Sequence, residues 1–383
     1  MINKAVLFMV ILVISAFCLA QDSFEDYLSG QNQQQTDYIN RQNADFANYH
    51  QQQDSLFIQY KDDIEKLWNE FRESTPKDWV SYNEDFSGRS EVSFESGEIK
   101  VDAVVESTSP QDQVKAREII KKQIVSILQE KDSTDKPILA EQVKNPVSSG
   151  KVISEDQIEE IAEEIAANAE TTEVTGADNQ TRLKYTISME LIPDHIRKRA
   201  EKYKHIIENF CQEYQIDPRL ALAIAHTESY FNPKAYNRHG NAYGMMQIVP
   251  KYAGINMNNI LFHKNQKPTS EELFNPDINL HMGIAYLRWL ADNKWDKVKN
   301  ETNQTYCMIC SYNGGPGTIY KAMTGKMNKI GQKNWDKMFA DLSTMDSQKL
   351  YKKLRKDVPY EETRNYIEKV VAKMSNEYAM GRN

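Results

Sequence analysis

The first hydrophobic segment of this chain is one continuous apolar run, Ala5 to Ile14, which follows the positive charge of Lys4. The run is shorter than the roughly 17–25 residues that a membrane-spanning helix needs. It leads to small residues before Gln21, the pattern that a signal peptidase reads. We therefore interpret residues 1–20 as a signal peptide, which predicts a periplasmic or cell-envelope protein. The alternatives are an uncleaved anchor helix and lipidation at Cys18, although the residue before Cys18 is bulky where lipidation favours a small one.

The next segment is polar and then becomes amphipathic. Residues 21–55 are rich in Gln and Asn and poor in aliphatic side chains, as in a tether or a solvated helix. From Phe57 to Phe71, hydrophobic residues recur every three or four positions, which predicts an amphipathic helix that Pro76 ends. We expect residues 21–75 to form a polar tether followed by this helix.

Strand and helix periods then follow each other between residues 76 and 190. Alternating apolar positions on both sides of Ser96-Gly97 predict a β-hairpin, and a third alternation from Leu183 to Met189 predicts another strand. Helical spacing from Val114 and from Ser154 predicts two helices, and the second begins with a sequence of capping-box form. We expect residues 76–190 to be a small α+β domain.

From Pro193 onward the hydrophobic pattern is helical, with no strand-like alternation, and prolines stand at plausible helix boundaries. We therefore expect an all-α domain over residues 191–383 and an α+β fold class for the whole chain. The helices are expected near residues 194–214, 218–230, 241–254, 270–293, 300–312, 314–323, 331–341, 346–354 and 360–380.

Composition narrows the class of protein. Hydrophobic residues make up 40% of the 383 positions, enough for a core, and the formal net charge of −8 argues against nucleic acid as a partner. Beyond the signal peptide the cysteines are Cys211, Cys307 and Cys310. The Cys307–Cys310 CxxC lies in an apolar stretch, which favours packing over a disulfide or a redox pair. Without a second CxxC or a nearby histidine pair, we expect no metal site.

One acidic residue, Glu228, interrupts the apolar helix expected at 218–230. A carboxylate among aliphatic side chains is costly unless it is paired or neutralised, and desolvation raises its pKa. A carboxyl group that keeps its proton near neutral pH can serve as a general acid. Cleavage of a glycosidic bond requires such a proton on the bridging oxygen, so Glu228 is our candidate for that role.

Two cassettes accompany Glu228, namely Gly244-Met-Met-Gln247 and Ser311-Tyr-Asn-Gly-Gly315. Most glycosidases use a second carboxylate. The other acidic residues of the helical half are expected to be surface or capping groups: Asp277, Asp292, Asp336, Glu361 and Glu362. One acid suffices if the C6 hydroxyl of N-acetylmuramic acid attacks C1, because Glu228 then acts first as acid and afterwards as base.

These cassettes, followed by Val358-Pro-Tyr-Glu-Glu-Thr-Arg-Asn-Tyr366, resemble the lytic transglycosylase family with the goose-lysozyme-like fold. Upstream, Trp79–Tyr82, Arg89–Gly97 and Lys184–Pro193 resemble the N-terminal domain of membrane-bound lytic murein transglycosylase C. The resemblance covers nearly the whole chain beyond the signal peptide. It implies an all-α goose-lysozyme-like catalytic domain behind the small α+β domain.

The resemblance also implies residue roles, with Glu228 as the catalytic acid and base. The substrate-binding or supporting residues would be Ser229, Met246, Gln247, Tyr312, Asn313 and Tyr366. Ser229 would orient groups locally, while Met246 and Gln247 would line the cleft. Asn313 would contact the substrate, and Tyr366 would hydrogen-bond Glu228. The sequence departs from the family at Met245, where Leu is usual, in a slightly longer loop over 234–243, and in lacking a good lipidation motif.

We therefore expect an exported lytic transglycosylase that cleaves the β-1,4 bond between N-acetylmuramic acid and N-acetylglucosamine. Its partner would be the glycan strands of peptidoglycan, no cofactor is expected, and the N-terminus is the candidate for membrane association. A muramidase that hydrolyses the same bond with water is the enzymatic alternative. A peptidoglycan-binding protein without turnover is the other.

Overall fold

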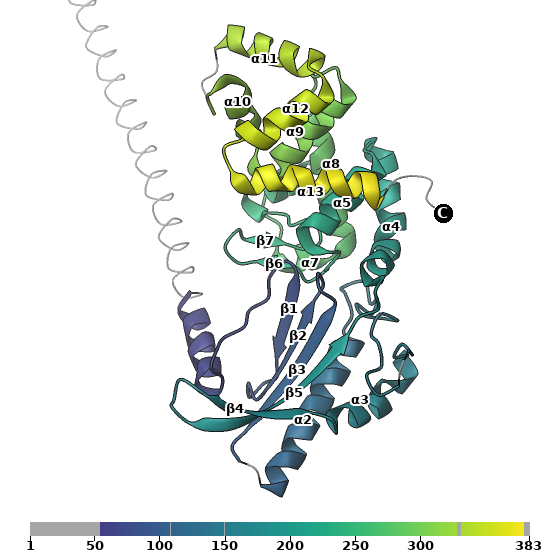
Figure 1. Cartoon of the computed structure of the whole chain (residues 1–383). Coiled ribbons are helices and arrows are strands. Elements are labelled where there is room, and N and C mark those ends of the chain that lie inside the picture. Colours follow the sequence, from purple (N-terminus) through teal and green to yellow (C-terminus); the bar gives the residue numbers. More distant parts are fainter. Residues whose placement is uncertain (1–53, 108, 149, 328–330, 379–383) are drawn as a thin grey trace, which may run out of the picture. The chain divides into compact units, whose positions relative to one another are not determined.

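The structure, a computed structural model, describes residues 54–107, 109–148, 150–327 and 331–378 (Figure 1). The chain divides into two compact units, Met1–Lys66 and Leu67–Asn383. In the first unit, residues 54–66 are described and are helical. The expected signal peptide and most of the expected tether lie outside the described residues. None of the helices that the structure describes has both the length and the apolar character needed to cross a bilayer.

The amphipathic helix ends earlier than its hydrophobic spacing predicts. Helical structure stops at residue 67, although the periodic pattern continues to Phe71. The Trp68 indole donates a hydrogen bond to the carbonyl oxygen of Phe86 over 2.8 Å. The Phe71 ring stacks on Tyr82 with 6.4 Å between the ring centroids. The last apolar residues of the pattern therefore pack on the sheet and do not extend the helix.

Five antiparallel strands form the sheet of the second unit, in the order β1-β2-β3-β5-β4. The strands are β1 Asp78–Tyr82, β2 Gly88–Ser93, β3 Glu98–Val105, β4 Glu170–Thr175 and β5 Thr181–Glu190. The predicted hairpin, β2 with β3, and the predicted third strand, β5, are confirmed. Sequence patterning missed β1 and β4 because both are edge strands. Each buries a single side chain and so shows no alternation.

Two helices cover this sheet. The longer, α2 (Pro110–Gln129), packs on β2, β3 and β5, and α3 (Ile158–Ala166) packs on α2. Ser109 caps α2 by accepting a hydrogen bond from the backbone N–H of Asp112 over 3.1 Å. The capping box expected at Ser154 is wrong, because the Ser154 hydroxyl donates to Oε1 of Gln157 and no side chain caps the backbone there. We call this assembly, β1 to β5 with α2 and α3, the sheet lobe.

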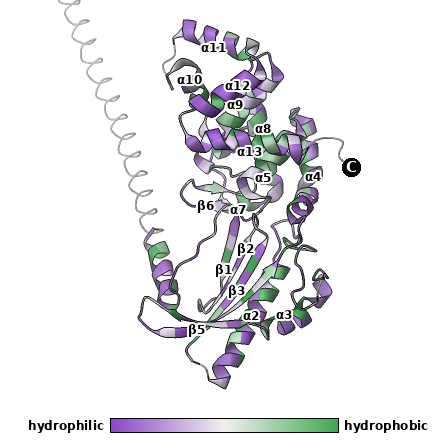
Figure 2. Cartoon of the chain, viewed as in Figure 1, coloured by the Kyte–Doolittle hydropathy of each residue, from purple (hydrophilic) through white to green (hydrophobic). Residues whose placement is uncertain are grey.

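The remaining elements form the helical lobe, which is built around its own buried cluster of hydrophobic side chains, separate from that of the sheet lobe. Hydrophobic positions gather on α8 and α9 at its centre (Figure 2). The α+β fold class and the helical second half are confirmed. The helices are α4 His195–Tyr214, α5 Pro218–Ser229, α6 Ile255–Phe262, α7 Ser270–Phe274, α8 Pro276–Asn293, α9 Glu301–Gly314, α10 Gly317–Thr324, α11 Gln332–Thr344, α12 Ser347–Asp357 and α13 Glu361–Asn376.

The helix expected over residues 241–254 forms only at its end, where Pro250–Gly254 makes a π-helical turn that leads into α6, and the lobe is not free of strands. The chain instead makes a two-stranded ribbon, β6 (Tyr236–Asn237) with β7 (Ala242–Tyr243), and then a turn. Gly244 in this turn has φ +72°, and a Cβ there would lie 2.4 Å from the carbonyl oxygen of Leu273. Gln247 is also left-handed, at φ 49°. Two left-handed residues so close together are incompatible with a continuous right-handed helix.

The expected helix over 270–293 is divided at Pro276 into α7 and α8, because Asn275 caps the second helix with its side chain. Cys307 and Cys310 are buried free thiols of α9, as is Cys211 in α4. Burial raises the pKa of Cys310 to about 12, so that group stays protonated and packs as a small hydrophobic side chain.

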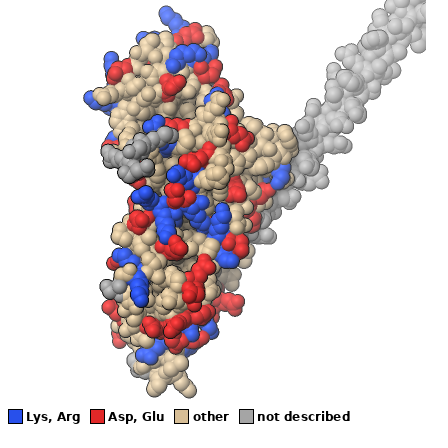
Figure 3. Space-filling model, turned by 90° about the vertical axis from the view of Figure 1, so that its right-hand side faces the viewer, with Lys and Arg blue, Asp and Glu red and all other residues tan. Residues whose placement is uncertain are grey.

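Helix α4 carries ion pairs to the loop that follows α2. Lys198 pairs with Glu141 over 2.6 Å, and Lys202 pairs with Asp132 over 3.2 Å. On the face turned toward the viewer in Figure 3, Lys and Arg side chains gather near the middle and Asp and Glu border them. The two lobes belong to one compact unit, Leu67–Asn383, so the domain boundary expected at residue 190 remains a prediction.

Candidate active site

Glu228 lies in the last turn of α5. The helix begins at Pro218 after Asp217, whose side chain accepts a hydrogen bond from the N–H of Arg219. Its apolar residues from Leu220 to Ala225 are buried in the core of the helical lobe. Glu228 itself is half-buried, so the carboxyl group stands at the edge of that core.

The carboxyl group of Glu228 is held by a tyrosine from the last helix of the lobe, which packs on α5. Tyr366, on α13 and 6% exposed, donates its hydroxyl to Oε1 of Glu228 over 2.7 Å. Burial raises the pKa of Glu228 to about 7, the hydrogen bond from Tyr366 opposes this shift, and the charge of Glu362 adds to it. Near neutral pH the group therefore exists in both protonation states, as a residue that must give and take a proton requires.

The turn after β7 is fixed to the end of α5 and to the helices around it. The buried Ser229 hydroxyl donates to the carbonyl oxygen of Met245 over 2.8 Å. The backbone N–H of Met246 donates to Oδ1 of Asn279 over 2.8 Å. Tyr312 donates its hydroxyl to the carbonyl oxygen of Met246, also over 2.8 Å. These bonds hold the turn in place through its backbone.

The Met246 side chain, which we expected to line the cleft, is fully buried. It packs so closely on Gly283 of α8 that a Cβ at that glycine would lie 2.3 Å from its sulfur. Gln247, by contrast, borders a cavity. Its amide donates to the carbonyl oxygens of Gly244 over 3.0 Å and of Ala235 over 3.3 Å. Its Oε1 is buried and has no hydrogen-bond partner among the described residues.

Asn313 connects α9 to α13. Its Oδ1 accepts a hydrogen bond from the Thr363 hydroxyl over 2.6 Å, and its amide donates to Oε1 of Glu362 over 3.1 Å. The helices approach closely because α9 ends in glycine. A Cβ at Gly314 would lie 2.5 Å from Oγ1 of Thr363. The second cassette therefore joins the helix that carries Tyr366.

Glu362 is a functional candidate that sequence reasoning missed. We expected a surface or capping carboxylate, and the side chain is indeed exposed. It nevertheless bonds Asn313, and its charge raises the pKa of Glu228. The sequence spacing between Glu362 and Tyr366 could have identified this candidate. Residues four apart share one face of a helix, so Glu362 lies one turn before Tyr366.

A cavity of about 450 Å³ is lined by residues of both cassettes. The exposed ring of Tyr252 and the ring of Tyr286 border it. Aromatic faces beside amide groups suit a sugar ring, which presents both C–H and O–H groups. The lining residues are Gln247, Ile248, Val249, Tyr252, Ala253, Tyr286, Ser311, Tyr312, Asn313, Gly314, Gly315 and Pro316.

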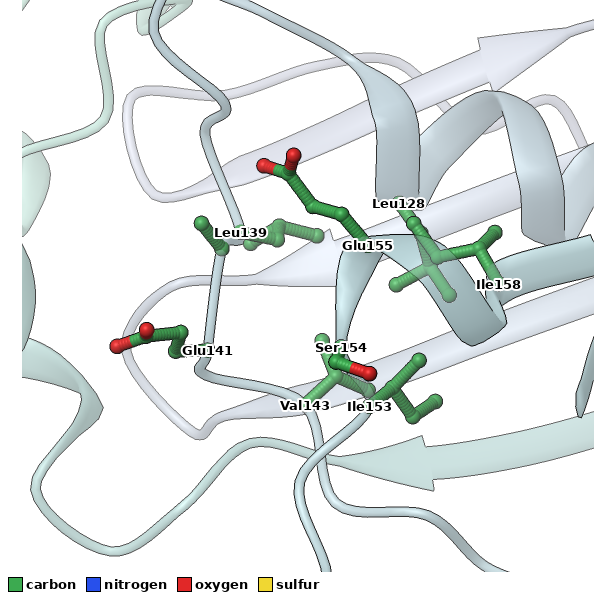
Figure 4. A pocket seen from close by; sticks show the side chains of 9 residues that line it. Leu128, Leu139, Glu141, Val143, Ile153, Ser154, Glu155 and Ile158 are labelled. Atoms are coloured by element: carbon green, nitrogen blue, oxygen red, sulfur yellow. The ribbon is translucent and has the colours of Figure 1, made fainter.

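Another cavity, of about 290 Å³, lies in the sheet lobe between α2, α3 and the loop that joins them (Figure 4). Its lining is mainly aliphatic, with Glu141 and Glu155 at its border. Figure 4 shows the carboxyl groups of these two side chains well apart from each other. Glu141 is already paired with Lys198. The arrangement offers no acid–base pair, so we place the chemistry at Glu228.

The histidines near the site do not form a metal centre. His226, on α5, is buried and lies 3.2 Å from Nζ of Lys373 and 3.0 Å from the hydroxyl of Tyr378. Burial lowers the pKa of His226 to about 3, so this residue is neutral at physiological pH. His239 is exposed. Across the described ranges, no group of three His, Cys, Asp or Glu side chains is placed to hold a metal ion.

The fold and the site together define the class of protein. A helical lobe that combines one perturbed carboxyl group with a cavity lined by aromatic and amide side chains is the arrangement of a glycan-cleaving enzyme, and residues 205–335 match the transglycosylase SLT domain. Residues 45–202 match the N-terminal domain of membrane-bound lytic murein transglycosylase C. The chain belongs to the membrane-bound lytic murein transglycosylase C family.

Individual relatives agree with this assignment. Membrane-bound lytic murein transglycosylase C of Salmonella arizonae is 31% identical over 301 residues, which cover 76% of this chain and 78% of that protein. The protein of the same name from Sodalis glossinidius is 29% identical over 298 residues, with coverages of 76% and 79%. Among solved structures, the 70 kDa soluble lytic transglycosylase of Escherichia coli aligns with 48% of this chain and 25% of its own. Its sequence identity is 24% and its TM-score is 0.35.

Proposed function

We propose that this chain is a peptidoglycan lytic transglycosylase in which Glu228 is the single acid and base. The substrate is the β-1,4 bond between N-acetylmuramic acid and N-acetylglucosamine, and the product carries a 1,6-anhydromuramoyl end. The observation that carries the proposal is the hydrogen bond from Tyr366 to Glu228, a half-buried carboxyl group whose pKa is raised to about 7.

Two proton transfers complete the reaction. Protonated Glu228 gives its proton to the glycosidic oxygen, so that the C1–O bond breaks and N-acetylglucosamine leaves as an alcohol. The C6 hydroxyl oxygen of the muramoyl residue then attacks C1, and the Glu228 carboxylate takes the hydroxyl proton. The acid is regenerated and no water is consumed. A pKa near the working pH suits both halves of this cycle.

The supporting residues have two roles: some hold the turn after β7, and others contact the substrate. Ser229 and Tyr312 hold the turn at Met245 and Met246 through its backbone carbonyls, and this turn presents Gln247 to the cavity. The unpaired Oε1 of Gln247 is suited to accept a hydrogen bond from an N-acetyl N–H or a hydroxyl group. We assign substrate contact to Gln247 and Asn313. Met246 contributes its backbone and core packing.

The cell envelope is the location that the sequence and the relatives support. The apolar run in residues 1–20 fits an export signal, and the relatives of this chain are named as membrane-bound proteins. We propose a mature chain beginning at residue 21, with a tether and helix to 75, an α+β domain over 76–190 and the catalytic domain over 191–383. Any membrane association would act through the N-terminus.

The test is mass spectrometry of muropeptides released from purified sacculi by residues 21–383, beside the Glu228→Gln variant. Transglycosylation predicts products roughly 18 Da lighter than the corresponding hydrolytic products, the mass of the water not added. These products should disappear with Glu228→Gln, while binding to sacculi persists. Reducing-end products would establish the hydrolytic muramidase. An absence of products from the parent chain would favour a peptidoglycan-binding protein.

A further inference from the structure

The residue that ends the catalytic helix has an unusual backbone. Tyr230 follows Glu228 by two positions and adopts the left-handed conformation, with φ 54° and ψ 36°. Phe231 is left-handed as well, at φ 60°, and is fully buried. A large side chain in this region is strained, and the conformation persists where the surroundings hold it. The contacts of Tyr230 show what holds it.

The Tyr230 side chain leaves the helical lobe and packs on the hydrophobic core of the sheet lobe. Its hydroxyl donates to Oε1 of Glu95 over 2.5 Å, and Glu95 lies in the turn between β2 and β3. Nζ of Lys77 and Nζ of Lys373 lie 5.1 Å and 5.5 Å from the centre of its ring. Lys77 also pairs with Glu95 over 2.8 Å. The tyrosine is thus held on its ring and at its hydroxyl.

The backbone of Tyr230 is held to the same turn by Arg199 of α4, which is 1% exposed. Nε of Arg199 donates to the carbonyl oxygen of Tyr230 over 3.0 Å. Its Nη2 donates to the carbonyl oxygen of Phe94 over 2.9 Å, and its Nη1 donates to Oε1 of Gln142 over 2.9 Å. All three acceptors are neutral. A buried guanidinium with such partners is costly, so its retention points to a geometric role.

The chain beyond Phe231 continues to contact the sheet lobe. The Asn232 amide donates to the carbonyl oxygen of Pro76 over 3.4 Å. Lys234 pairs with Glu130 at the end of α2. This segment leads directly into the β6–β7 ribbon and the turn that carries Gln247. The sheet lobe therefore contacts the connection between the two parts of the active site.

We propose that the β2–β3 turn of the sheet lobe positions Glu228 for catalysis, through Glu95 bound to Tyr230 and through Arg199 bound to the carbonyl oxygens of Phe94 and Tyr230. This inference rests on the proposed function of Glu228. Tyr230 and Arg199 are positioning residues, since neither reaches the cavity. The role of the sheet lobe is to hold the left-handed end of α5, so that Glu228 meets the hydroxyl of Tyr366.

The experiment is a double-mutant cycle of Glu95→Gln and Tyr230→Phe in residues 21–383, with turnover of purified sacculi as the readout. Both changes conserve shape, and Glu95 is half exposed, so the fold should survive. We expect each variant to lower kcat roughly five-fold with KM unchanged, because neither residue touches substrate. The double variant should also lose roughly five-fold. Independent effects would multiply to roughly 25-fold.

The matched control is Glu98→Gln, which removes the same charge from the same hairpin. Glu98 lies near Lys100 within β3, at 3.7 Å, and so should leave kcat unchanged. The alkaline limb of the kcat profile, where the rate falls with rising pH, distinguishes a positioning effect on Glu228 from the mere loss of a negative charge. A weaker Tyr366–Glu228 bond moves the limb to higher pH, whereas removal of a negative charge alone would move it to lower pH.

Unchanged kcat in both single variants, or losses that multiply in the double variant, would overturn the inference. A parallel fall in melting temperature would indicate a structural role alone and would overturn it as well. If activity is lost in Glu228→Gln but unchanged in Glu95→Gln, the proposed function of Glu228 still stands. An inactive parent chain would refute both proposals together.

Discussion

Tyr366 donates its hydroxyl to Oε1 of Glu228 over 2.7 Å, although 138 residues separate the two along the chain. The bond joins α5 to α13 and opposes the desolvation that raises the pKa of Glu228. It therefore has two separable effects. It orients the carboxyl group, and it determines at which pH that group changes charge.

Replacement of Tyr366 by Phe should change both the rate and its pH dependence. Loss of a hydrogen bond to a charged group costs about 1.5–3 kcal/mol, so we expect kcat to fall by about tenfold or more. The bond favours the carboxylate, so its loss raises the pKa of Glu228. The alkaline limb of the kcat profile should then move to higher pH. Sacculus turnover measured between pH 5 and 9 checks both effects, and a limb that moves to lower pH would contradict this reading.

Glu362→Gln should move the same limb in the opposite direction. The charge of Glu362 raises the pKa of Glu228, so its removal makes the carboxyl group easier to ionise and shifts the limb to lower pH. Glu361→Gln is the matched control, because this neighbour is also exposed and belongs to the same helical turn. Equal shifts for the two variants would show that the effect is general surface charge.

The raised pKa of Glu228 also predicts a pH-dependent stability difference. The folded group has a pKa of about 7, and the unfolded group keeps the ordinary value of 4.5. The folded chain thus binds an extra proton between these values, and the contribution is present below pH 4.5 and lost as pH rises through 7. Glu228→Gln stays neutral throughout. The free energy of unfolding of Glu228→Gln should therefore exceed that of the parent chain by an amount that grows with pH. We expect this difference to rise from near zero at pH 4.5 to at most about 3 kcal/mol above pH 7.

Urea denaturation of both proteins at pH 4.5, 6 and 8 measures this difference. The figure is an upper bound, since Glu228 is half-buried and water offsets part of the cost. A constant difference across the three pH values would mean that the pKa of Glu228 is ordinary. Such a result would remove the main support for its role as an acid at neutral pH.

Gly314→Ala should separate α9 from α13. The added Cβ would lie 2.5 Å from Oγ1 of Thr363 and 2.7 Å from Cγ2 of Thr318. We expect a loss of about 1–3 kcal/mol in stability and reduced activity, because α13 carries Tyr366. Gly331→Ala is the control, since a Cβ there meets no atom within 4 Å. Thermal unfolding and turnover of the two variants test the contact. Equal stability would show that α13 adjusts freely.

Much of the site could be predicted from the sequence because its residues lie in local cassettes. The sequence alone shows that Glu228 is the one carboxylic acid in its apolar helix, and desolvation predicts that its pKa is raised. The periods of the helices and of β2, β3 and β5 reflect one buried face each. The edge strands β1 and β4 were not predicted, because each buries a single side chain and so shows no alternation of apolar and polar residues. The first part of the helix expected over 241–254 does not form, because Gly244 is left-handed and lies against Leu273 and Asn279 of distant helices, and Gln247 is left-handed as well.

The sequence by itself therefore identified Glu228 as the candidate acid and the second half of the chain as helical. Only the tertiary structure decided how that residue is held. Tyr366, Asn313 and Glu362 meet near Glu228 because α9 and α13 pack at a glycine. Arg199 and Tyr230 join the end of α5 to the sheet lobe through backbone carbonyl oxygens. Such oxygens are the same in every residue, so no pattern of side chains along the chain reveals which of them a buried arginine will bind.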